Sequence, residues 1–185
     1  KGGRRLCLRP EGTAGVMRHA AGLGEQETAG ARWFYLGPMF RSERPQAGRR
    51  RQFHQLGVEC LEPPSSLVDA EILALQVDLL RAWGIGDCRV RLNTRGEAGG
   101  HAKVAAGLRA ALAAHEAELC DDCRRRIGEN VLRVLDCKNA ACQRIVAQVP
   151  PPTAFMSEAS REYWAQVARR LPALDVAHDL DPLLV

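Results

Sequence analysis

The sequence lacks the long hydrophobic runs of membrane proteins. No stretch approaches the ~18 continuous apolar residues that a membrane helix needs, and Lys1 opens a polar run instead of a signal-peptide pattern. Internal repeats and low-complexity tracts are also absent. With 46% hydrophobic and 26% charged residues, the composition excludes disordered and collagen-like chains. We therefore expect a soluble, cytoplasmic protein without a membrane partner.

The ends of the chain lack the usual marks of a whole protein. The sequence of 185 residues begins without Met and ends on the apolar residues Leu183, Leu184 and Val185. We expect it to be a piece of a longer protein. Its length suits one domain, or one domain that carries a smaller inserted one.

Positive charge is concentrated in one short segment. The formal net charge is +4, and residues 41–51 contain five Arg and one Glu, so these eleven residues hold the whole excess. Guanidinium groups are planar, permanently charged and rich in donors, which suits phosphate recognition. The segment therefore predicts a phosphate-binding loop, and a solvated arginine-rich loop is the alternative.

A disulfide framework is not expected, because the seven cysteines occur in a chain without a secretion signal. Four of them form two pairs separated by thirteen residues, namely Cys120 and Cys123, then Cys137 and Cys142. This spacing is compatible with a tetrahedral structural zinc site, and packing of four reduced thiols is the alternative. The other three, Cys7, Cys60 and Cys88, are interpreted as small core residues.

The residue pattern predicts an α+β fold. Residues 33–41 and 52–61 are rich in aromatic and branched side chains and predict an antiparallel hairpin with a long basic loop. Apolar spacing predicts a helix from Leu67 to Trp83, ended by Gly84. Residues 89–93 alternate as a half-buried strand does.

Composition changes at the Gly-rich residues 96–100. Helical patterns follow at 101–119 and 157–171, with Ser157 as a start signal and Pro172 as a stop, and residues 173–177 are expected to return to the first domain as a strand. The architecture expected is an antiparallel sheet domain interrupted by a mostly helical insert.

Two segments carry residues suited to ligand chemistry. Glu11 and Thr13 lie on a Pro/Gly turn ahead of a short helical stretch, 14–21. Residues two apart on a strand share a face, so Arg51, Phe53 and Gln55 present a cation, an aromatic ring and an amide together. Such a face can hold a triphosphate, a base and a polar ligand.

Glu59 continues the same strand face. An unpaired buried carboxylate is costly, so Glu59 should meet a cation or donors, either an amino or imidazole group of a ligand or an internal arginine such as Arg41. Alternatives also exist for the other residues: Glu11 and Thr13 as ordinary helix-start residues, Phe53 as core, and Gln55 as a solvated strand position.

Three segments resemble the histidyl-tRNA synthetases, a class II aminoacyl-tRNA synthetase family. They are LRPEGTAGVMR, WFYLGPMFRSERPQAGRRRQFHQLGVE and VLRVLDCKN. The most specific part, FRSERPQAGRRRQFHQ, resembles the class II motif 2 in its histidine-specific form. The resemblance extends over essentially the whole chain, and it implies a class II catalytic core at 1–98 with the motif 2 hairpin at 32–61, a helical insertion domain at 99–171, and a return segment at 172–185.

The resemblance also implies roles for single residues. Arg41 would be the catalytic arginine that holds the ATP α-phosphate and the histidine carboxylate. The family's histidine pocket corresponds to Glu11, Thr13, Gln55 and Glu59. The other ATP-binding positions are Glu43 at the adenine end, Arg49 and Arg51 at the phosphates, and Phe53 stacked on adenine.

The implied activity is histidine–tRNA ligation: histidine and ATP with Mg²⁺ give histidyl-adenylate, and the histidyl group passes to the 3′ end of tRNA(His). The implied partners are histidine, ATP and the tRNA acceptor end, and the arginines at 124–126 could touch tRNA phosphate or be a solvated basic face. Class II motifs 1 and 3 and the anticodon-binding domain have no counterpart here. We therefore expect weak or no activity from this chain alone, and the homodimer implied for the whole protein is left open.

Two rival functions stay open at this point. The noncatalytic regulatory subunit of ATP phosphoribosyltransferase shares the implied fold, but it would be free to lose the pocket residues, which are all present here. A zinc-containing RNA-binding module would use the basic loop and need no amino-acid pocket. Histidine binding separates the second rival from the synthetase.

Overall fold

The computed structural model describes residues 3, 6–44, 46–97 and 99–184. The chain divides into two compact units, Lys1–Ser65 and Ser66–Val185. Residues 1, 98 and 185, which bound the expected domains, and Pro45 of the expected loop lie outside the described residues. The expected boundaries at residues 98 and 171 fall inside the second unit and stay a prediction.

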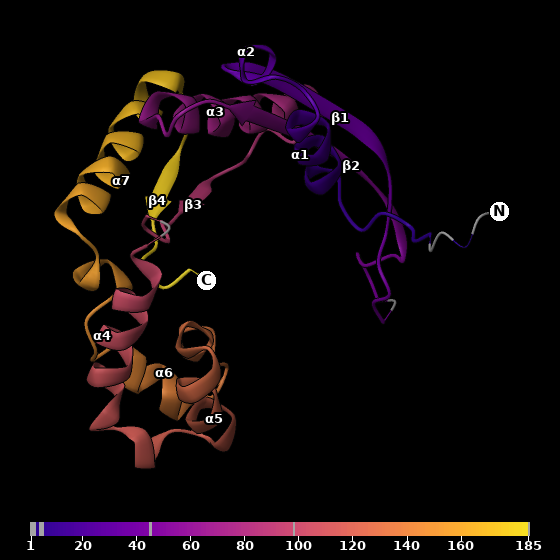
Figure 1. The fold of residues 1–185 in the computed structure, drawn as a ribbon. Helices are drawn as coiled ribbons and strands as arrows, with labels where there is room; N and C mark the ends of the chain where they lie inside the picture. The colour runs from indigo at the N-terminus through magenta and orange to yellow at the C-terminus, as the bar shows by residue number, and fades with distance from the viewer. Residues whose placement is uncertain (1–2, 4–5, 45, 98, 185) are drawn as a thin grey trace. The chain divides into compact units, whose positions relative to one another are not determined.

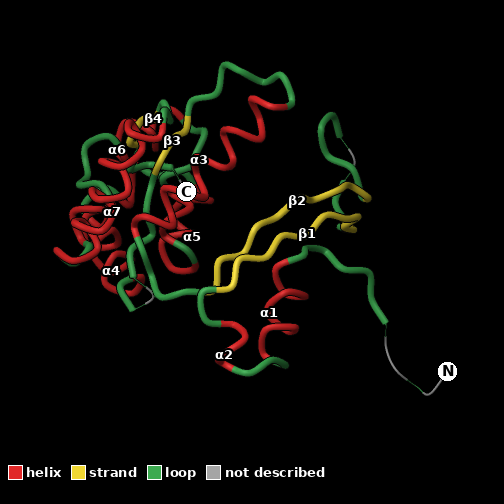
Figure 2. The backbone as a smooth tube through the Cα atoms, turned by 90° about the horizontal axis from the view of Figure 1, so that it is seen from above, coloured by secondary structure: helices red, strands yellow, loops and turns green. Residues whose placement is uncertain are grey.

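The first unit consists of a two-stranded sheet and two short helices. Strands β1 (Ala31–Phe40) and β2 (Gln52–Leu61) pair antiparallel, from Ala31 opposite Leu61 to Phe40 opposite Gln52. Helices α1 (Thr13–Ala21) and α2 (Glu25–Thr28) precede them, and α1 lies beside the two strands (Figure 2). The predicted hairpin and the predicted helix after Glu11 are confirmed.

The second unit contains the remaining elements (Figure 1). Its α-helices are α3 (Ser66–Ala82), α4 (His101–Ala113), α5 (Asp121–Glu129), α6 (Ala140–Val146) and α7 (Glu158–Arg170). Four 3₁₀ turns lie between or after them: η1 (Glu116–Glu118), η2 (Val131–Val134), η3 (Pro152–Phe155) and η4 (Leu171–Leu174). Strands β3 (Val90–Leu92) and β4 (His178–Leu180) form a short parallel pair.

One hydrophobic core of this unit joins α3, α7 and the β3–β4 pair. Its buried residues are Ala70, Val77, Leu92, Val167, Leu171 and Val176. Helix α3 gives way to a turn at Gly84, whose φ of +84° suits glycine, and α7 starts with Ser157 accepting from the Ser160 amide at 3.1 Å. These helix ends agree with the start and stop signals in the sequence.

The returning strand was predicted in the wrong place. Residues 173–177 do not form a strand, because Pro172 and the left-handed Asp175 (φ 54°) carry the chain through the 3₁₀ turn η4. The strand β4 begins at His178, and Val90 pairs with it in parallel. The turn allows Leu171 and Val176 to be buried in the same core, which a continuous extended segment would not do.

A second core is built from the segment between α4 and η3. Its fully buried members are Leu108, Leu112, Leu119, Val131, Val134, Cys123 and Cys142. The helical pattern predicted to 119 is interrupted, because α4 ends at Ala113 and the short turn η1 follows. This break brings Leu119 into the same core as Leu112. Within the described part of the chain, no helix is both long and apolar enough to cross a membrane.

Candidate active site

One face of the β1–β2 hairpin carries three of the predicted ligand-binding residues. Directly opposed residues in an antiparallel pair point to the same side of the sheet. The opposed pairs on this face are Trp33 and Glu59, Tyr35 and Gly57, Gly37 and Gln55, and Met39 and Phe53. The structure thus places Phe53, Gln55 and Glu59 on one face, as the strand alternation predicts.

The acidic turn before α1 is held against this face. The Thr13 hydroxyl donates a hydrogen bond of 2.6 Å to Glu59 Oε1, and both residues are partly buried. The Tyr35 ring lies between Gly12 and Gly57, so close that a Cβ added to either glycine would overlap it. Glycine at both positions therefore allows the turn and the strand to approach the ring.

Glu59 meets a hydroxyl donor and not an arginine. In the described part of the chain no ion pair of Glu59 is found, and the Arg41 Nε donates instead to the Pro10 carbonyl at 3.0 Å. The alternative of an internal Arg41–Glu59 salt bridge is therefore wrong. Since only Oε1 is engaged by Thr13, Oε2 can accept from a ligand donor.

Glu11 behaves as a helix-start residue in this structure. Its Oε1 accepts a hydrogen bond of 3.0 Å from the Ala14 amide in the first turn of α1, and its side chain is exposed. Free amide donors at a helix start are commonly satisfied in this way. Glu11 is thus near Thr13 in the turn, but the structure does not bring its carboxylate onto Glu59.

Three hydrogen bonds fix the segment before the turn to the end of β1. The Phe40 amide donates to the Arg9 carbonyl at 2.9 Å, and the Arg9 Nε donates to the Pro38 carbonyl at 2.9 Å. The third bond is the one from Arg41 to Pro10. Sequence reasoning missed Arg9 in this role, because a contact across 29 residues has no signature in local spacing.

Arg41 lies over the ring of Phe53. Its Cζ is 4.9 Å from the ring centroid, within the range of a cation–π contact. The Arg41 amide also donates to the Arg51 carbonyl at 2.9 Å, which extends the hairpin by one pair. Phe53 is partly buried next to the buried Met39. Its ring therefore packs against the hairpin and still exposes part of its surface to a ligand.

The basic loop folds back on itself around Glu43. Arg51 Nε donates to the Glu43 carbonyl at 3.2 Å, and Arg49 Nη1 is 3.7 Å from Glu43 Oε2. Arg49 and Arg51 are exposed, so these contacts orient their guanidinium groups without removing them from solvent. The loop therefore offers cations next to Arg41, as its composition predicts.

Gln55 has an unsatisfied acceptor. Its Oε1 is buried and accepts no hydrogen bond from any described residue. Buried polar atoms without a partner are rare in native proteins, and each one calls for an explanation such as a bound ligand. The alternative of a solvated strand position does not fit, because the oxygen is removed from solvent.

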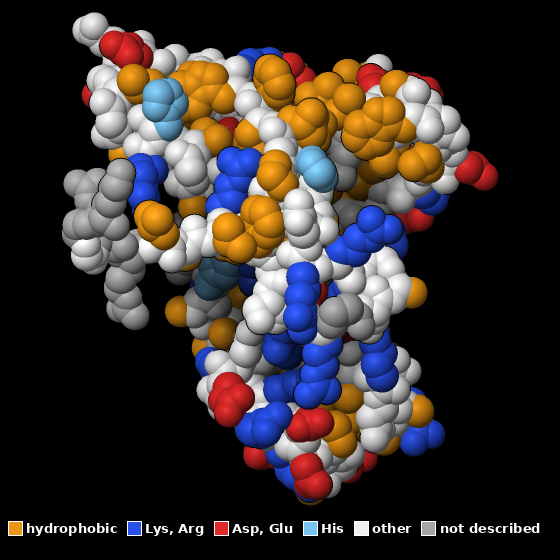
Figure 3. Space-filling view, turned by 90° about the vertical axis from the view of Figure 1, so that its right-hand side faces the viewer, with side chains coloured by type: hydrophobic (Ala, Val, Ile, Leu, Met, Phe, Trp, Pro, Cys, Tyr) orange, Lys and Arg blue, Asp and Glu red, His pale blue; other side chains and the backbone are white. Residues whose placement is uncertain are grey.

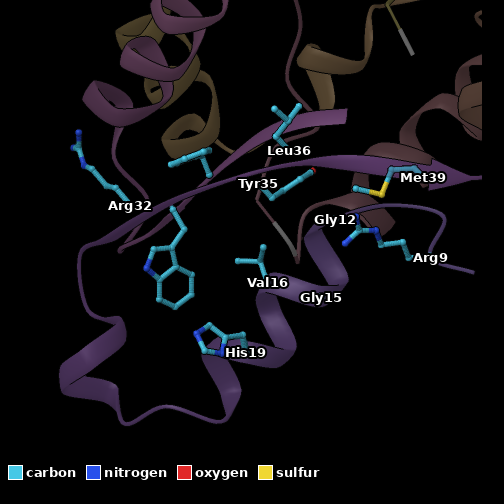
Figure 4. A pocket seen from close by; sticks show the side chains of 11 residues that line it. Arg9, Gly12, Gly15, Val16, His19, Arg32, Tyr35, Leu36 and Met39 are labelled. Carbon is cyan, nitrogen blue, oxygen red and sulfur yellow. The ribbon is translucent and has the colours of Figure 1, made fainter. Parts of the chain in front are cut away.

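A pocket of about 500 Å³ lies between α1 and β1 (Figure 4). Figure 4 shows Val16 and His19 of α1 and Tyr35 of β1 around it, and the His19 and Trp33 rings are 5.5 Å apart. None of the residues predicted to bind ligand lines this pocket. Tyr35, which sequence reasoning missed, is the link between the pocket and the face that carries Glu59.

The four clustered cysteines converge in the second unit. All four sulfur atoms lie within 4.8 Å of one another, whereas Cys7, Cys60 and Cys88 are not part of the group. None of these last three is fully buried, and Cys7 is exposed, so their interpretation as core residues is wrong for Cys7.

The arginines at 124–126 are engaged within the protein. Arg124 donates to the Leu119 carbonyl at 2.7 Å and pairs with Asp121, while Arg125 pairs with Asp122 at 3.0 Å. Figure 3 shows many Lys and Arg side chains over its lower half, where α4, α5 and α6 lie in Figure 1. The nearby acidic partners offset part of this charge, which favours the solvated basic face over a phosphate site.

Comparison with known proteins decides the family. A family model described as "Histidyl-tRNA synthetase" matches residues 1–175. The chain belongs to the histidyl-tRNA synthetase family. It is 41% identical to a histidine–tRNA ligase of Halothermothrix orenii and 44% identical to one of Synechococcus elongatus, and each alignment covers 100% of this chain.

A solved structure gives the same result for the fold. The apo histidyl-tRNA synthetase of S. aureus superposes with a TM-score of 0.72 at 30% identity, and the match covers 100% of this chain and 43% of that one. The α+β class II synthetase fold expected from the sequence is therefore confirmed. The chain spans less than half the length of the histidyl-tRNA synthetases it matches, with 44% and 43% of the two ligases covered.

Proposed function

We propose that this chain forms part of the active site of a histidine–tRNA ligase, in which it binds histidine and ATP and supports formation of histidyl-adenylate. The observation that carries the proposal is the Thr13–Glu59 hydrogen bond. It joins the acidic turn to the strand face that also holds the unsatisfied Gln55 oxygen, so acceptor groups from two distant segments lie on one face of the hairpin.

The acceptors fit the donors of histidine. An α-amino group and a protonated ring nitrogen are donors only, and a carboxylate or an amide oxygen accepts from them. We assign this role to Glu59, Gln55 and the Thr13 oxygen, with Glu11 at the edge of the turn. Burial of the Gln55 oxygen selects for a ligand that donates a hydrogen bond to it, because a ligand that left this oxygen unpaired would lose binding energy.

Arg41 is assigned to the reacting phosphate. A histidine carboxylate oxygen attacks the α-phosphorus of MgATP, the bond to the β-phosphate oxygen breaks, and pyrophosphate leaves with the electron pair. Negative charge spreads over the α-phosphoryl oxygens during this step, and a fixed guanidinium stabilises it. The bond from Arg41 Nε to the Pro10 carbonyl and its position over Phe53 hold the group in place, and Lys would lack the planar fork.

The remaining ATP contacts follow from the loop. Phe53 offers a ring face to adenine, Glu43 lies at the adenine end, and the exposed Arg49 and Arg51 meet the outer phosphates. The 3′-terminal ribose hydroxyl of the tRNA then attacks the histidyl carbonyl and releases AMP.

We propose residues 1–98 as the catalytic part and 99–171 as the insertion domain, and the cytoplasm as the place of the reaction.

Histidine binding by calorimetry tests the proposal on this chain. We expect measurable binding that Gln55→Ala weakens, since the variant removes the unpaired acceptor. Gln52→Ala is the matched control, because Gln52 is a glutamine of the same strand on the opposite, exposed face. Equal affinities for the two variants, or no histidine binding at all, would count against the proposal, and the latter result favours an RNA-binding module.

Adenylate formation tests the role of Arg41. In a full-length protein that contains this segment, Arg41→Ala should reduce histidine-dependent pyrophosphate exchange by at least about 100-fold, the usual cost of losing one stabilising donor. Arg44→Ala, in the same loop, should leave exchange within about threefold. Near-normal exchange in the Arg41 variant contradicts the assignment.

A further inference from the structure

Four cysteine sulfurs from separate segments meet in the second unit. Cys120 is the N-cap residue of α5 and Cys123 lies in its first turn. Cys137 follows the turn η2, and Cys142 lies in the first turn of α6. All four sulfur atoms lie within 4.8 Å of one another. This cluster holds four of the chain's seven cysteines. It is separate from the candidate active site, whose residues all belong to the first unit.

The spacing of the sulfurs matches a tetrahedral metal site. A Zn–S bond is about 2.3 Å, so sulfurs at the corners of a ZnS₄ tetrahedron are about 3.8 Å apart. The Cys120 and Cys137 sulfurs are 3.9 Å apart. A disulfide requires a separation of about 2.05 Å, so the sulfurs are placed for a shared ion and not for direct bonding.

Backbone donors point at the sulfurs. The Cys120 amide donates to the Cys142 sulfur at 3.3 Å, and the Asn139 amide donates to the Cys137 sulfur at 3.4 Å. The Cys123 amide also hydrogen bonds to the Cys120 sulfur. Donors of this kind stabilise thiolates and orient metal ligands.

Three of the four sulfurs are buried, which makes negative charge on them costly unless a cation is bound. Cys123, Cys137 and Cys142 are buried in the core between α4 and η3. The backbone amides favour negatively charged sulfur, whereas burial makes an unpaired charge costly. A divalent cation bound by all four sulfurs would satisfy both conditions.

We propose that Cys120, Cys123, Cys137 and Cys142 together bind one zinc ion, which joins α5, η2 and α6 into one folded body. Four thiolates fill a tetrahedron and leave no open position, so the site is structural and not catalytic. The ion takes the place that a larger apolar core would occupy, because the helices it joins are short: α5 has nine residues and α6 has seven.

Metal analysis tests the proposal. The chain purified with reductant and without chelator should contain about one zinc per molecule. Replacement by Co²⁺ should produce the intense visible bands of tetrahedral cobalt together with a thiolate charge-transfer band. Iron in place of zinc, an inter-cysteine disulfide in the reduced preparation, or no metal with no cobalt spectrum would overturn the proposal.

Two variants separate ligation from packing. Cys120→Ala removes the least buried of the four sulfurs and should weaken zinc binding by more than about 100-fold, since changes outside the ligand set alone can cost that much. Cys88→Ala is the matched control, a partly exposed cysteine of the same unit outside the cluster, and should keep one zinc. Equal zinc content in both variants would refute the ligand set.

Chelation provides a readout that does not depend on variants. Zinc removal by EDTA should abolish the cooperative unfolding transition of the α4–η3 core, because a structural site contributes its binding energy to folding. If Cys120→Ala fails to fold, the cobalt spectrum of the unaltered chain still decides. A zinc-free chain that keeps its helical content and its unfolding transition would show that the thiols are only packed.

Discussion

Thr13 and Glu59, 46 residues apart in the chain, share a hydrogen bond of 2.6 Å. The bond joins the first residue of α1 to Glu59 near the end of β2. A hydroxyl donor at this distance stabilises a carboxylate that would otherwise be costly to place on a partly buried surface. It is the contact that turns two separate segments into one candidate histidine site.

The strength of this contact can be measured by a double-mutant cycle. We expect Thr13→Val and Glu59→Gln each to lower the free energy of unfolding by about 1–2 kcal/mol, and the double variant to lose less than the sum. Urea unfolding provides the values. Thr28→Val is the control, because Thr28 bonds only to carbonyls of its own short helix. Strict additivity would show that the two side chains do not interact in solution.

The position of the Tyr35 ring requires glycine at position 57. Gly57→Ala places a Cβ on the ring, so the ring must leave its position between the strand and α1. Overpacking of this kind costs about 1–3 kcal/mol. Gly15→Ala, with nothing within 4 Å of the added Cβ, should be neutral or stabilise the helix by up to about 1 kcal/mol. Thermal or urea unfolding compares the two, and equal stabilities would contradict the packing described for Tyr35.

We expect the free energy of unfolding to fall at alkaline pH because of Tyr163. Burial and the 2.9 Å hydrogen bond it donates to Asp69 raise its pKa from 10.0 to about 12. A pKa raised on folding means that the folded state retains the proton longer. The contribution to stability is therefore complete below pH about 10 and is lost as the pH rises from about 10 to about 12.

Unfolding in urea between pH about 8 and about 11 checks this prediction. Tyr163→Phe should be less stable at the lower pH and should show a smaller decline above pH about 10 than the unaltered chain. Asp69→Asn serves as the matched variant, because it removes the charge and keeps an acceptor for the hydroxyl. The same alkaline slope with and without Tyr163 would rule out its role.

Local patterns in the sequence predicted the hairpin and the helices α1, α3 and α7. Alternation along residues 52–61 put Phe53, Gln55 and Glu59 on one side, and this follows from the two-residue period of any strand. Ser157 and Gly84 marked helix ends because caps are satisfied by residues next to them in the chain. The same reasoning failed at β4, where burial of Leu171 and Val176 in one core outweighed the extended pattern of residues 173–177.

The sequence by itself determined the helices α1, α3 and α7, the hairpin, the strand face and the paired spacing of Cys120 to Cys142, since each depends on neighbours along the chain. Only the tertiary structure decided that Glu59 meets Thr13 and not Arg41, and that four sulfurs converge within 4.8 Å. These choices depend on which side chains reach one another across long loops. Tertiary packing determines which of these contacts form, because two distant residues meet only where the surfaces that carry them fit together.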